Sequence, residues 1–243
     1  MWQRRLGVIF LFLGLSVDAA DLHGYTEEFE PFNFTQDGQA VGLANEILNR
    51  VISRAKLDIE RSSLPWLRAV QMNESENNSF LYSTVRTPDR ELKYLWVGPF
   101  DQCEVWLIKL KKRQDIALKS FEDSKKYLVG GPRGSAGQAM MLGKGFPSER
   151  LDISLDEERN VRKLYAGRFD LSVGMLIPHH YSAKKIGLDE QQLAPAFLLE
   201  KGLGCYFAFN RGVDPILFQR FQAAYAELER SGEIKKIRER YLH

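Results

Sequence analysis

The segment Thr87-Pro88-Asp89-Arg90 combines residue types that could bind an anionic group. It follows residues 80–83, an apolar run that predicts a β-strand. Threonine is a favoured N-cap residue and proline suits the first position of a helix, so we expect a helix to begin here with Arg90 in its first turn. A guanidinium can hold a carboxylate through two parallel hydrogen bonds. Arg90 is therefore a candidate carboxylate anchor; the alternative is a solvated arginine on a helix surface.

A second candidate anion site is the glycine-rich segment 131–137, which follows a predicted strand at 127–130. A Gly/Ser loop that opens a helix presents backbone N–H groups and a positive dipole end to an anion. The segment lacks the Gly-Lys-Ser/Thr ending of a phosphate-binding P-loop. Gly134 and Ser135 are the candidate contacts, and the alternative is an ordinary strand-to-helix turn.

Two aromatic side chains could pack on a ligand. Phe29 precedes a Pro-Phe pair, and Trp66 opens a predicted helix after Pro65. An aromatic face suits an apolar or a cationic group. Both residues can equally be read as part of a hydrophobic core.

Catalytic and metal-binding patterns are weak. An enzyme needs an acid or a base in its cleft, for which Glu28 and Asp101 are the candidates. The sequence shows neither a Ser-His-Asp nor a Cys-His arrangement. His179 and His180 are adjacent, so their side chains point apart on either a helix or a strand. We therefore predict no catalytic residue, no metal and no cofactor.

The N-terminus has the pattern of an export signal. Arg4 and Arg5 precede an apolar run of about ten residues, too short to span a bilayer comfortably. Small residues follow, and cleavage after Ala19 or Ala20 is expected, which makes residues 1–20 a signal peptide and the mature chain periplasmic. The formal net charge of +2, without a basic run interleaved with aromatic residues, argues against nucleic-acid binding.

Strands alternate with helices along the rest of the chain, a pattern typical of α/β domains. Residues 41–55 carry apolar residues at helical period, and residues 215–231 form a second amphipathic helix.

From Tyr25 onward the chain resembles the family 3 extracellular solute-binding proteins, which serve ABC importers of polar amino acids. The resemblance is carried by an ordered set of short motifs: an aromatic before Pro31-Phe32, Gly42-x-x-x-Glu46, Pro65-Trp66-x-Arg68-Ala69, Thr87-x-x-Arg90, Gly167-Arg168-x-Asp170 and a C-terminal Gly232-x-Ile234-x-x-Ile237.

This resemblance implies a type II periplasmic binding protein with two lobes. Each lobe would be a mostly parallel sheet flanked by helices, and two strands would form the hinge. Residues 21–100 and 208–243 would form lobe 1, and residues 101–207 lobe 2. The chain would cross the hinge near 100–104 and 203–207.

The resemblance also implies a ligand site between the lobes, to which we assign Phe29, Trp66, Ser83, Val85, Arg90, Gly134, Ser135 and Met175. Amino-acid binders of this family carry an aspartate, which holds the ligand's ammonium, where this chain has Met175. No acid occurs from Leu171 to Leu188. We therefore expect a ligand with a carboxylate and an apolar body rather than an ordinary α-amino acid, unless Glu28 supplies the missing charge.

Cys103 and Cys205 are the only cysteines, and both fall on the implied hinge strands. In an oxidising compartment we expect a disulfide between them; the alternative is two buried thiols. The implied partners are a small-molecule ligand and an ABC permease in the inner membrane, with the protein itself a monomer. The alternatives are a dehydratase-like enzyme that acts on a small, prephenate-like acid and a ligand sensor.

Overall fold

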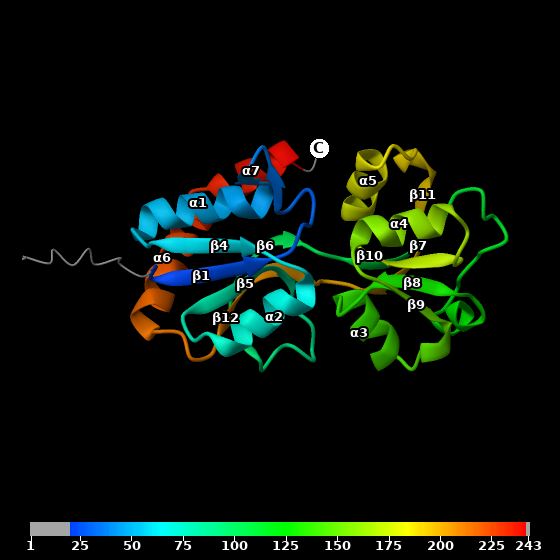
Figure 1. Cartoon of the computed structure of the whole chain (residues 1–243), viewed down its shortest axis with the longest axis horizontal. Helices are drawn as coiled ribbons and strands as arrows, with labels where there is room; N and C mark the ends of the chain where they lie inside the picture. The colour runs from blue at the N-terminus through cyan, green and yellow to red at the C-terminus, as the bar shows by residue number, and fades with distance from the viewer. Residues whose placement is uncertain (1–19, 242–243) are drawn as a thin grey trace, which may run out of the picture.

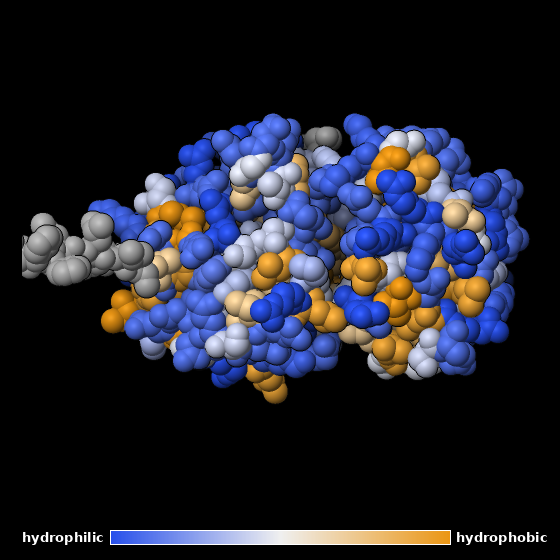
Figure 2. Space-filling view, viewed as in Figure 1, coloured by the Kyte–Doolittle hydropathy of each residue, from blue (hydrophilic) through white to orange (hydrophobic). Residues whose placement is uncertain are grey.

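The computed structural model describes residues 20–241, so all of the predicted signal peptide except its last residue lies outside the described part. Figure 1 shows two lobes side by side, connected by extended segments of chain. In Figure 2 a hollow separates the lobes on the face in view, and its borders are mainly hydrophilic. No helix within residues 20–241 combines the length and the apolar character that a membrane crossing requires.

Lobe 1 is built on a five-stranded sheet of order β4-β1-β5-β12-β6. Its strands are β1 (Leu22–Thr26), β4 (Ile59–Ser63), β5 (Ser79–Val85), β6 (Tyr94–Gln102) and β12 (Gly204–Asn210). Its helices are α1 (Leu43–Ala55), α2 (Trp66–Ser75), α6 (Pro215–Arg230) and α7 (Glu233–Tyr241), and a hairpin joins β2 (Phe34–Gln36) to β3 (Gln39–Val41). Helices α1, α6 and α7 pack together, whereas α2 packs on β1, β5 and β12.

Lobe 2 repeats this plan with a sheet of order β11-β7-β10-β8-β9. Its strands are β7 (Val105–Leu110), β8 (Val129–Pro132), β9 (Leu151–Ser154), β10 (Leu171–Gly174) and β11 (Leu193–Glu200). Its α-helices are α3 (Ala136–Gly143), α4 (Glu157–Tyr165) and α5 (Leu176–Lys185), and its short 3₁₀ helices are η1 (Glu122–Lys126), η2 (Ser148–Arg150) and η3 (Glu190–Gln192).

The predicted two-lobe α/β class is confirmed. In each sheet one strand runs against the other four: β12 is antiparallel to both of its neighbours in lobe 1, and β7 is antiparallel to both of its neighbours in lobe 2. The sheets are therefore mostly parallel in strand direction. The carboxyl ends of β1 and β5 in lobe 1, and of β8 and β10 in lobe 2, face the junction between the lobes (Figure 1).

The core of lobe 1 is aromatic. Phe80 of β5 stacks on Phe209 of β12 with ring centroids 4.9 Å apart, and Phe221 of α6 lies 4.9 Å from Phe209. All three side chains are fully buried. Buried aromatic pairs contribute about 0.5–1.5 kcal/mol beyond their area burial, so this cluster ties α6 to the sheet.

Helix α1 begins at Leu43, two residues after the start of the predicted helical pattern, because Gly42 has a backbone that helix residues cannot adopt. Its φ is 105°, and a Cβ at this position would lie 2.6 Å from the carbonyl oxygen of Phe32. Only glycine fits this approach.

The hinge consists of two neighbouring segments, one from β6 to β7 and one from β11 to β12. The N–H of Cys103 donates to the carbonyl of Leu203 at 2.9 Å, and Cys205 pairs with Asp101 between β12 and β6. A disulfide joins Cys103 to Cys205, whose Cα atoms are 5.5 Å apart. The predicted disulfide is confirmed.

Because β12 begins at Gly204 and pairs with β5 and β6, residues 204–207 belong to the sheet of lobe 1. Residues 101–102 also lie in that sheet, as the end of β6. The predicted lobe boundaries, after residue 100 and after residue 207, therefore fall within β6 and β12.

The helix predicted at Thr87 does not form. Residues 88–93 make consecutive turns instead, with the N–H of Arg90 donating to the carbonyl of Thr87 at 3.0 Å and that of Lys93 donating to Arg90 at 3.0 Å. The Thr87 hydroxyl donates to Asp89 at 2.7 Å rather than accepting a backbone N–H. Strand β6 begins at Tyr94, so the connection is too short for a helix.

Candidate ligand-binding site

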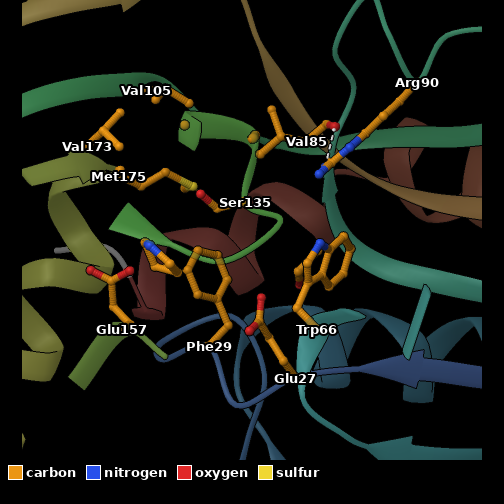
Figure 3. A pocket seen from close by; sticks show the side chains of 15 residues that line it. Glu27, Phe29, Trp66, Val85, Arg90, Val105, Ser135, Glu157, Val173 and Met175 are labelled. Atoms are coloured by element: carbon orange, nitrogen blue, oxygen red, sulfur yellow. Dashed lines mark hydrogen bonds between the residues drawn. The ribbon is translucent and has the colours of Figure 1, made fainter. Parts of the chain in front are cut away.

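A cavity of about 70 Å³ lies between the lobes, at the carboxyl ends of their strands. This is the edge at which open α/β sheets bind ligands. Lobe 1 contributes side chains from the loop after β1, the first turn of α2, β5 and the turn after it: Glu27, Phe29, Trp66, Ser83, Val85 and Arg90. Lobe 2 contributes residues at the starts of α3 and α4 and at the end of β10, among them Ser135, Glu157, Val173 and Met175. Figure 3 shows these side chains converging from both lobes.

The structure brings together seven of the eight residues that the sequence assigns to the site, although they come from six separate segments. Gly134 does not line the cavity; it lies at the contact between the lobes. There its carbonyl oxygen accepts hydrogen bonds from Arg90 Nη2 and from Trp66 Nε1, both at 3.0 Å.

The Arg90 guanidinium is held by carbonyls and an aromatic ring. Besides the bond to Gly134, its Nη1 lies 3.4 Å from the carbonyl oxygen of Val85, and its central carbon lies 5.4 Å from the centre of the Trp66 ring. Burial lowers the pKa of Arg90, although the charges of Asp89, Tyr94 and Glu27 oppose this change. The hydrogen-bond acceptors of the guanidinium are neutral carbonyls, so a ligand carboxylate would find a preoriented cation.

In the loop at 131–137, Ser135 lines the cavity, and the backbone amides of Gly134 and Ser135 have partners within the protein. The N–H of Gly134 donates to Gln138 Oε1 at 2.6 Å, and that of Ser135 donates to Pro132 at 3.3 Å. The Ser135 hydroxyl caps α3 by accepting the N–H of Gln138 at 3.1 Å. These two amides therefore donate their hydrogen bonds within lobe 2. At the contact between the lobes Gly134 contributes its carbonyl oxygen, which accepts hydrogen bonds.

Asn33 positions the loop that carries Glu27 and Phe29. Its buried amide nitrogen donates to Thr26 Oγ1 at 2.7 Å and to the carbonyl of Glu27 at 2.5 Å, while its oxygen accepts the hydroxyl of Ser83. The sequence analysis did not identify Asn33 as a residue of the site.

Ser83 lies in β5 with a φ of 58°, a left-handed conformation that is uncommon for serine. It sits where the register between β5 and β12 shifts. Such outliers cluster at functional sites, and here the outlier borders the cavity.

Two carboxylates in the cavity were not expected. Glu27 follows β1 and Glu157 is the first residue of α4. Burial, followed by repulsion from Glu157, raises the pKa of Glu27 to about 8. One signal could have found these residues: Glu27 directly follows β1 and Glu157 lies three positions after the end of β9, and both are at the edge where the sheets present their functional groups.

Glu28, the acid considered from sequence, lies outside the cavity. Its carboxylate accepts the N–H of Thr35 at 2.8 Å and the hydroxyl of Ser63 at 2.6 Å. Asp101, the other candidate acid, is buried in β6 at the hinge and does not line the cavity.

The adjacent histidines do not form a metal site. His179 is buried and places its Nε2 2.7 Å from Ser172 Oγ. Within residues 20–241 no three His, Cys, Asp or Glu side chains converge as metal ligands would.

The sequence pattern of the bacterial extracellular solute-binding proteins, family 3, matches residues 23–243. The chain belongs to this family.

Solved structures share the fold of this solute-binding protein. A histidine kinase sensor domain with similarity to periplasmic binding proteins superposes with a TM-score of 0.81 at 18% identity, covering 91% of this chain and 95% of the other. The arginine-, lysine-, histidine-binding protein ArtJ from Geobacillus stearothermophilus gives 0.75 at 17% identity, with 91% and 94% covered. An ancestral amino acid-binding protein that is a precursor of cyclohexadienyl dehydratase gives 0.76 at 18%, with 91% and 95% covered. None of the curated proteins matches the chain. Identities this low show the fold alone.

The ligand preference inferred from Met175 remains a prediction for this solute-binding protein. Met175 lines the cavity as expected, but the cavity does not lack acids, because Glu27 and Glu157 line it from opposite lobes. The sequence argument considered only residues 171–188, whereas these two acids lie in the loop after β1 and at the start of α4.

Proposed function

We propose that the chain is a periplasmic binding protein that captures a small carboxylated solute between its lobes and delivers it to an ABC importer. Membership of the solute-binding family supports the binding role. The observation that supports a carboxylate ligand is Arg90, which lines the cavity between the lobes and whose guanidinium donates hydrogen bonds to neutral carbonyl oxygens.

The cleft suits a ligand that draws the lobes together. The lobes already meet through the Gly134 carbonyl, and a solute bound by Arg90 of lobe 1 and by the start of α3 in lobe 2 would add contacts to both. A ligand favours a closed state by the difference between its affinities for the closed and the open forms. The closed, monomeric complex would then be the form that an inner-membrane permease recognises.

A thermal-shift screen of amino acids, organic acids, amines and short peptides tests the proposal. A ligand present at about 100 times its Kd stabilises the folded state by roughly 2.7 kcal/mol, which the melting temperature reports. Calorimetry on each hit then measures the affinity. We expect at least one carboxylate to bind, and silence from every carboxylate would contradict the proposal.

An enzyme on the same scaffold is the second candidate, and Glu27 is the observation that favours it. A carboxyl with a pKa of about 8 in a partly apolar cavity is protonated at neutral pH and could act as a general acid. This replaces Glu28 and Asp101 as the candidate acid. Incubation with prephenate-like acids and analysis of the products separates this reading from simple binding.

A further inference from the structure

A buried histidine lies directly behind the wall that lobe 2 contributes to the cavity. The wall residue is Glu157, which lines the cavity and also a groove of about 620 Å³ that continues outward from it, the outer groove of the cleft. Its Oε1 lies 2.7 Å from Nδ1 of His179, a fully buried residue of α5. Figure 3 shows the Glu157 carboxylate at the edge of the cavity, on a different segment from Glu27.

Hydrogen bonds fix both the orientation and the proton of this imidazole. Nδ1 lies 2.9 Å from the carbonyl oxygen of Met175, which can only accept, so Nδ1 carries a hydrogen. Nε2 lies 2.7 Å from Ser172 Oγ. Asn160 donates to the same oxygen at 2.7 Å, which leaves the serine hydrogen free to point at Nε2. The neutral ring is therefore held as the Nδ1–H tautomer and cannot turn toward Glu157.

The Glu157 carboxylate lacks a hydrogen bond that its burial requires. Its Oε1 is buried and has no hydrogen-bond partner among the residues that the structure describes. A carboxylate oxygen that is buried without a donor is costly. A second proton on the ring, at Nε2, would relieve this cost, because it places a cation beside the carboxylate. Ser172 Oγ can accept the new N–H once its own hydrogen turns away.

Other charged groups face this pair from the elements packed around α5. Burial, followed by the neighbouring His179, lowers the pKa of His180, which Glu190 of η3 raises and Lys111 after β7 lowers. His180 is therefore neutral near neutral pH. The acids that flank Glu157 on α4 are already paired, namely Glu158 with Lys185 and Asp156 with Arg159. His179 is thus the group of this cluster on which an added proton would meet an unpaired carboxylate.

The cavity gains from this proton when it holds an anion. Arg90 contributes a positive charge to the cavity, and Glu157 contributes a negative one. A bound carboxylate would offset the charge of Arg90 and leave Glu157 as a second, unbalanced negative charge near it. Like charges in one desolvated site disfavour each other, so a proton on His179 would restore the balance.

We propose that His179 is a positioning residue that couples solute binding to proton uptake. When Arg90 binds a carboxylate, one proton from solvent adds to Nε2 of His179, and the resulting imidazolium holds and neutralises the Glu157 carboxylate. Histidine suits this role because its ordinary charge change falls between pH 5 and 8. The inference rests on the proposed function and adds its regulation by pH, since affinity for a carboxylate should fall as pH rises.

Calorimetry in two buffers with different heats of ionisation counts the protons taken up on binding. The probes are benzoate and 3-phenylpropionate, carboxylates that keep their charge between pH 6 and 8. The measurements use wild type and Glu27→Gln, because burial and then the charge of Glu157 raise the pKa of Glu27 to about 8, and its own titration would add to the uptake. In Glu27→Gln we expect uptake of up to about one proton, with affinity falling by up to about tenfold per pH unit.

Further variants in the Glu27→Gln background assign the proton. His179→Asn offers an N–H donor to the Met175 carbonyl but cannot ionise, so it should abolish proton uptake. Glu157→Gln should abolish it as well, and provides a second test if His179→Asn does not fold. His23→Asn is the matched control, because His23 lies in β1 with its Nε2 3.0 Å from Ser62 Oγ, outside the cavity, and it should leave the uptake unchanged. Circular dichroism spectra and melting curves report whether each variant is folded.

NMR of the imidazole C–H signals follows the protonation of His179 even without a bound probe, with His179→Asn assigning its signal. Glu157→Gln should lower the proton affinity of His179 about tenfold, and benzoate should raise it. Probe binding without proton uptake would overturn the coupling and leave the proposed function standing. If neither probe binds, an unchanged His179 titration in Glu157→Gln would also overturn it, whereas the thermal-shift screen alone decides the proposed function.

Discussion

At the scale of single residues, the cavity separates its charges by position. Arg90 lies against Trp66 and Gly134. Glu27 and Glu157 lie where the cavity opens into the outer groove of the cleft. No ion pair within 4.0 Å joins Arg90 to either acid in the described part of the chain. A site whose opposite charges are kept apart can bind a ligand with two charged ends in one orientation.

The first prediction concerns Arg90. Arg90→Ala should weaken binding of a carboxylate found by the screen by about 2–5 kcal/mol, as expected when one partner of a desolvated charge pair is removed. Calorimetry on the wild type and the variant measures the change. Arg86→Ala is the control, because Arg86 pairs with the exposed Glu91 and stacks on Trp96 outside the cavity. Equal affinities for wild type and Arg90→Ala would rule out the carboxylate assignment.

The second prediction uses the pKa of Glu27, which burial and the charge of Glu157 raise from 4.5 to about 8 while Arg90 opposes the shift. Between these pH values the unfolded chain loses the proton and the folded state keeps it. The contribution of Glu27 to the free energy of unfolding therefore falls as pH rises from about 4.5 to about 8, and is constant above.

Glu27→Gln removes this contribution, so its stability relative to wild type should increase with pH across the window. Urea unfolding at pH 5, 6, 7 and 8 measures the difference. Glu28→Gln should show no such gain, because hydrogen bonds from Ser63 and Thr35 lower the pKa of Glu28 even though burial opposes them. A constant difference between wild type and Glu27→Gln at all four pH values would show that Glu27 titrates normally.

At the scale of secondary-structure elements, the hinge strands connect the two sheets. Strand β12 pairs with both β5 and β6, and the disulfide from Cys103 to Cys205 lies where β6 leaves the sheet and β12 enters it. Both cysteines are fully buried. The bridge therefore ties together the two segments about which the lobes would rotate.

The third prediction is that the double variant Cys103→Ala/Cys205→Ala is less stable than wild type by about 2–4 kcal/mol, because the bridge closes a loop of 102 residues. Urea unfolding under oxidising conditions measures the loss. Wild-type protein with the bridge reduced should lose a similar amount. If the double variant unfolds at the same urea concentration as oxidised wild type, the disulfide is not a source of stability.

At the scale of the whole molecule, contacts between the lobes surround the cavity. Trp66 and Arg90 of lobe 1 reach Gly134 of lobe 2, and Lys185 of lobe 2 bridges Glu30 of lobe 1 and its own Glu158. Although burial opposes it, the hydrogen bonds that Lys185 donates to these two carboxylates raise the pKa of Lys185. The lobes thus meet through protein groups on more than one side of the ligand site.

The fourth prediction is that Lys185→Ala shifts the ligand-free protein toward an open form. Because the lysine is nearly half exposed, its interlobe ion pair is worth about 0–1 kcal/mol, so the ratio of closed to open molecules should fall by up to about fivefold. Small-angle X-ray scattering measures this as a larger radius of gyration. Lys184→Ala, which removes an exposed neighbouring charge, is the control. Identical scattering from Lys185→Ala and wild type would show that the ion pair does not influence closure.

The sequence by itself determined the architecture and much of the site. Periodicity located α1 and α6, and the alternation of strands and helices indicated α/β domains. The resemblance to the solute-binding family implied two lobes and pointed to Phe29, Trp66 and Arg90. These predictions succeed because periodicity and turn chemistry are local properties of the sequence, which do not depend on where a helix or strand packs in the fold. The disulfide also followed, since only one pairing of the cysteines exists.

Only the tertiary structure decided how groups from distant segments meet. Glu27 and Glu157 are 130 positions apart, and the packing of lobe 2 against lobe 1 makes both line the same cavity. The same packing turned the Gly134 carbonyl toward Arg90 and put turns where a helix was predicted, since β6 begins too soon after Thr87. A loop has no periodic pattern from which the direction of a side chain can be predicted. Its partners across the cleft therefore depend on how the two sheets are positioned relative to each other.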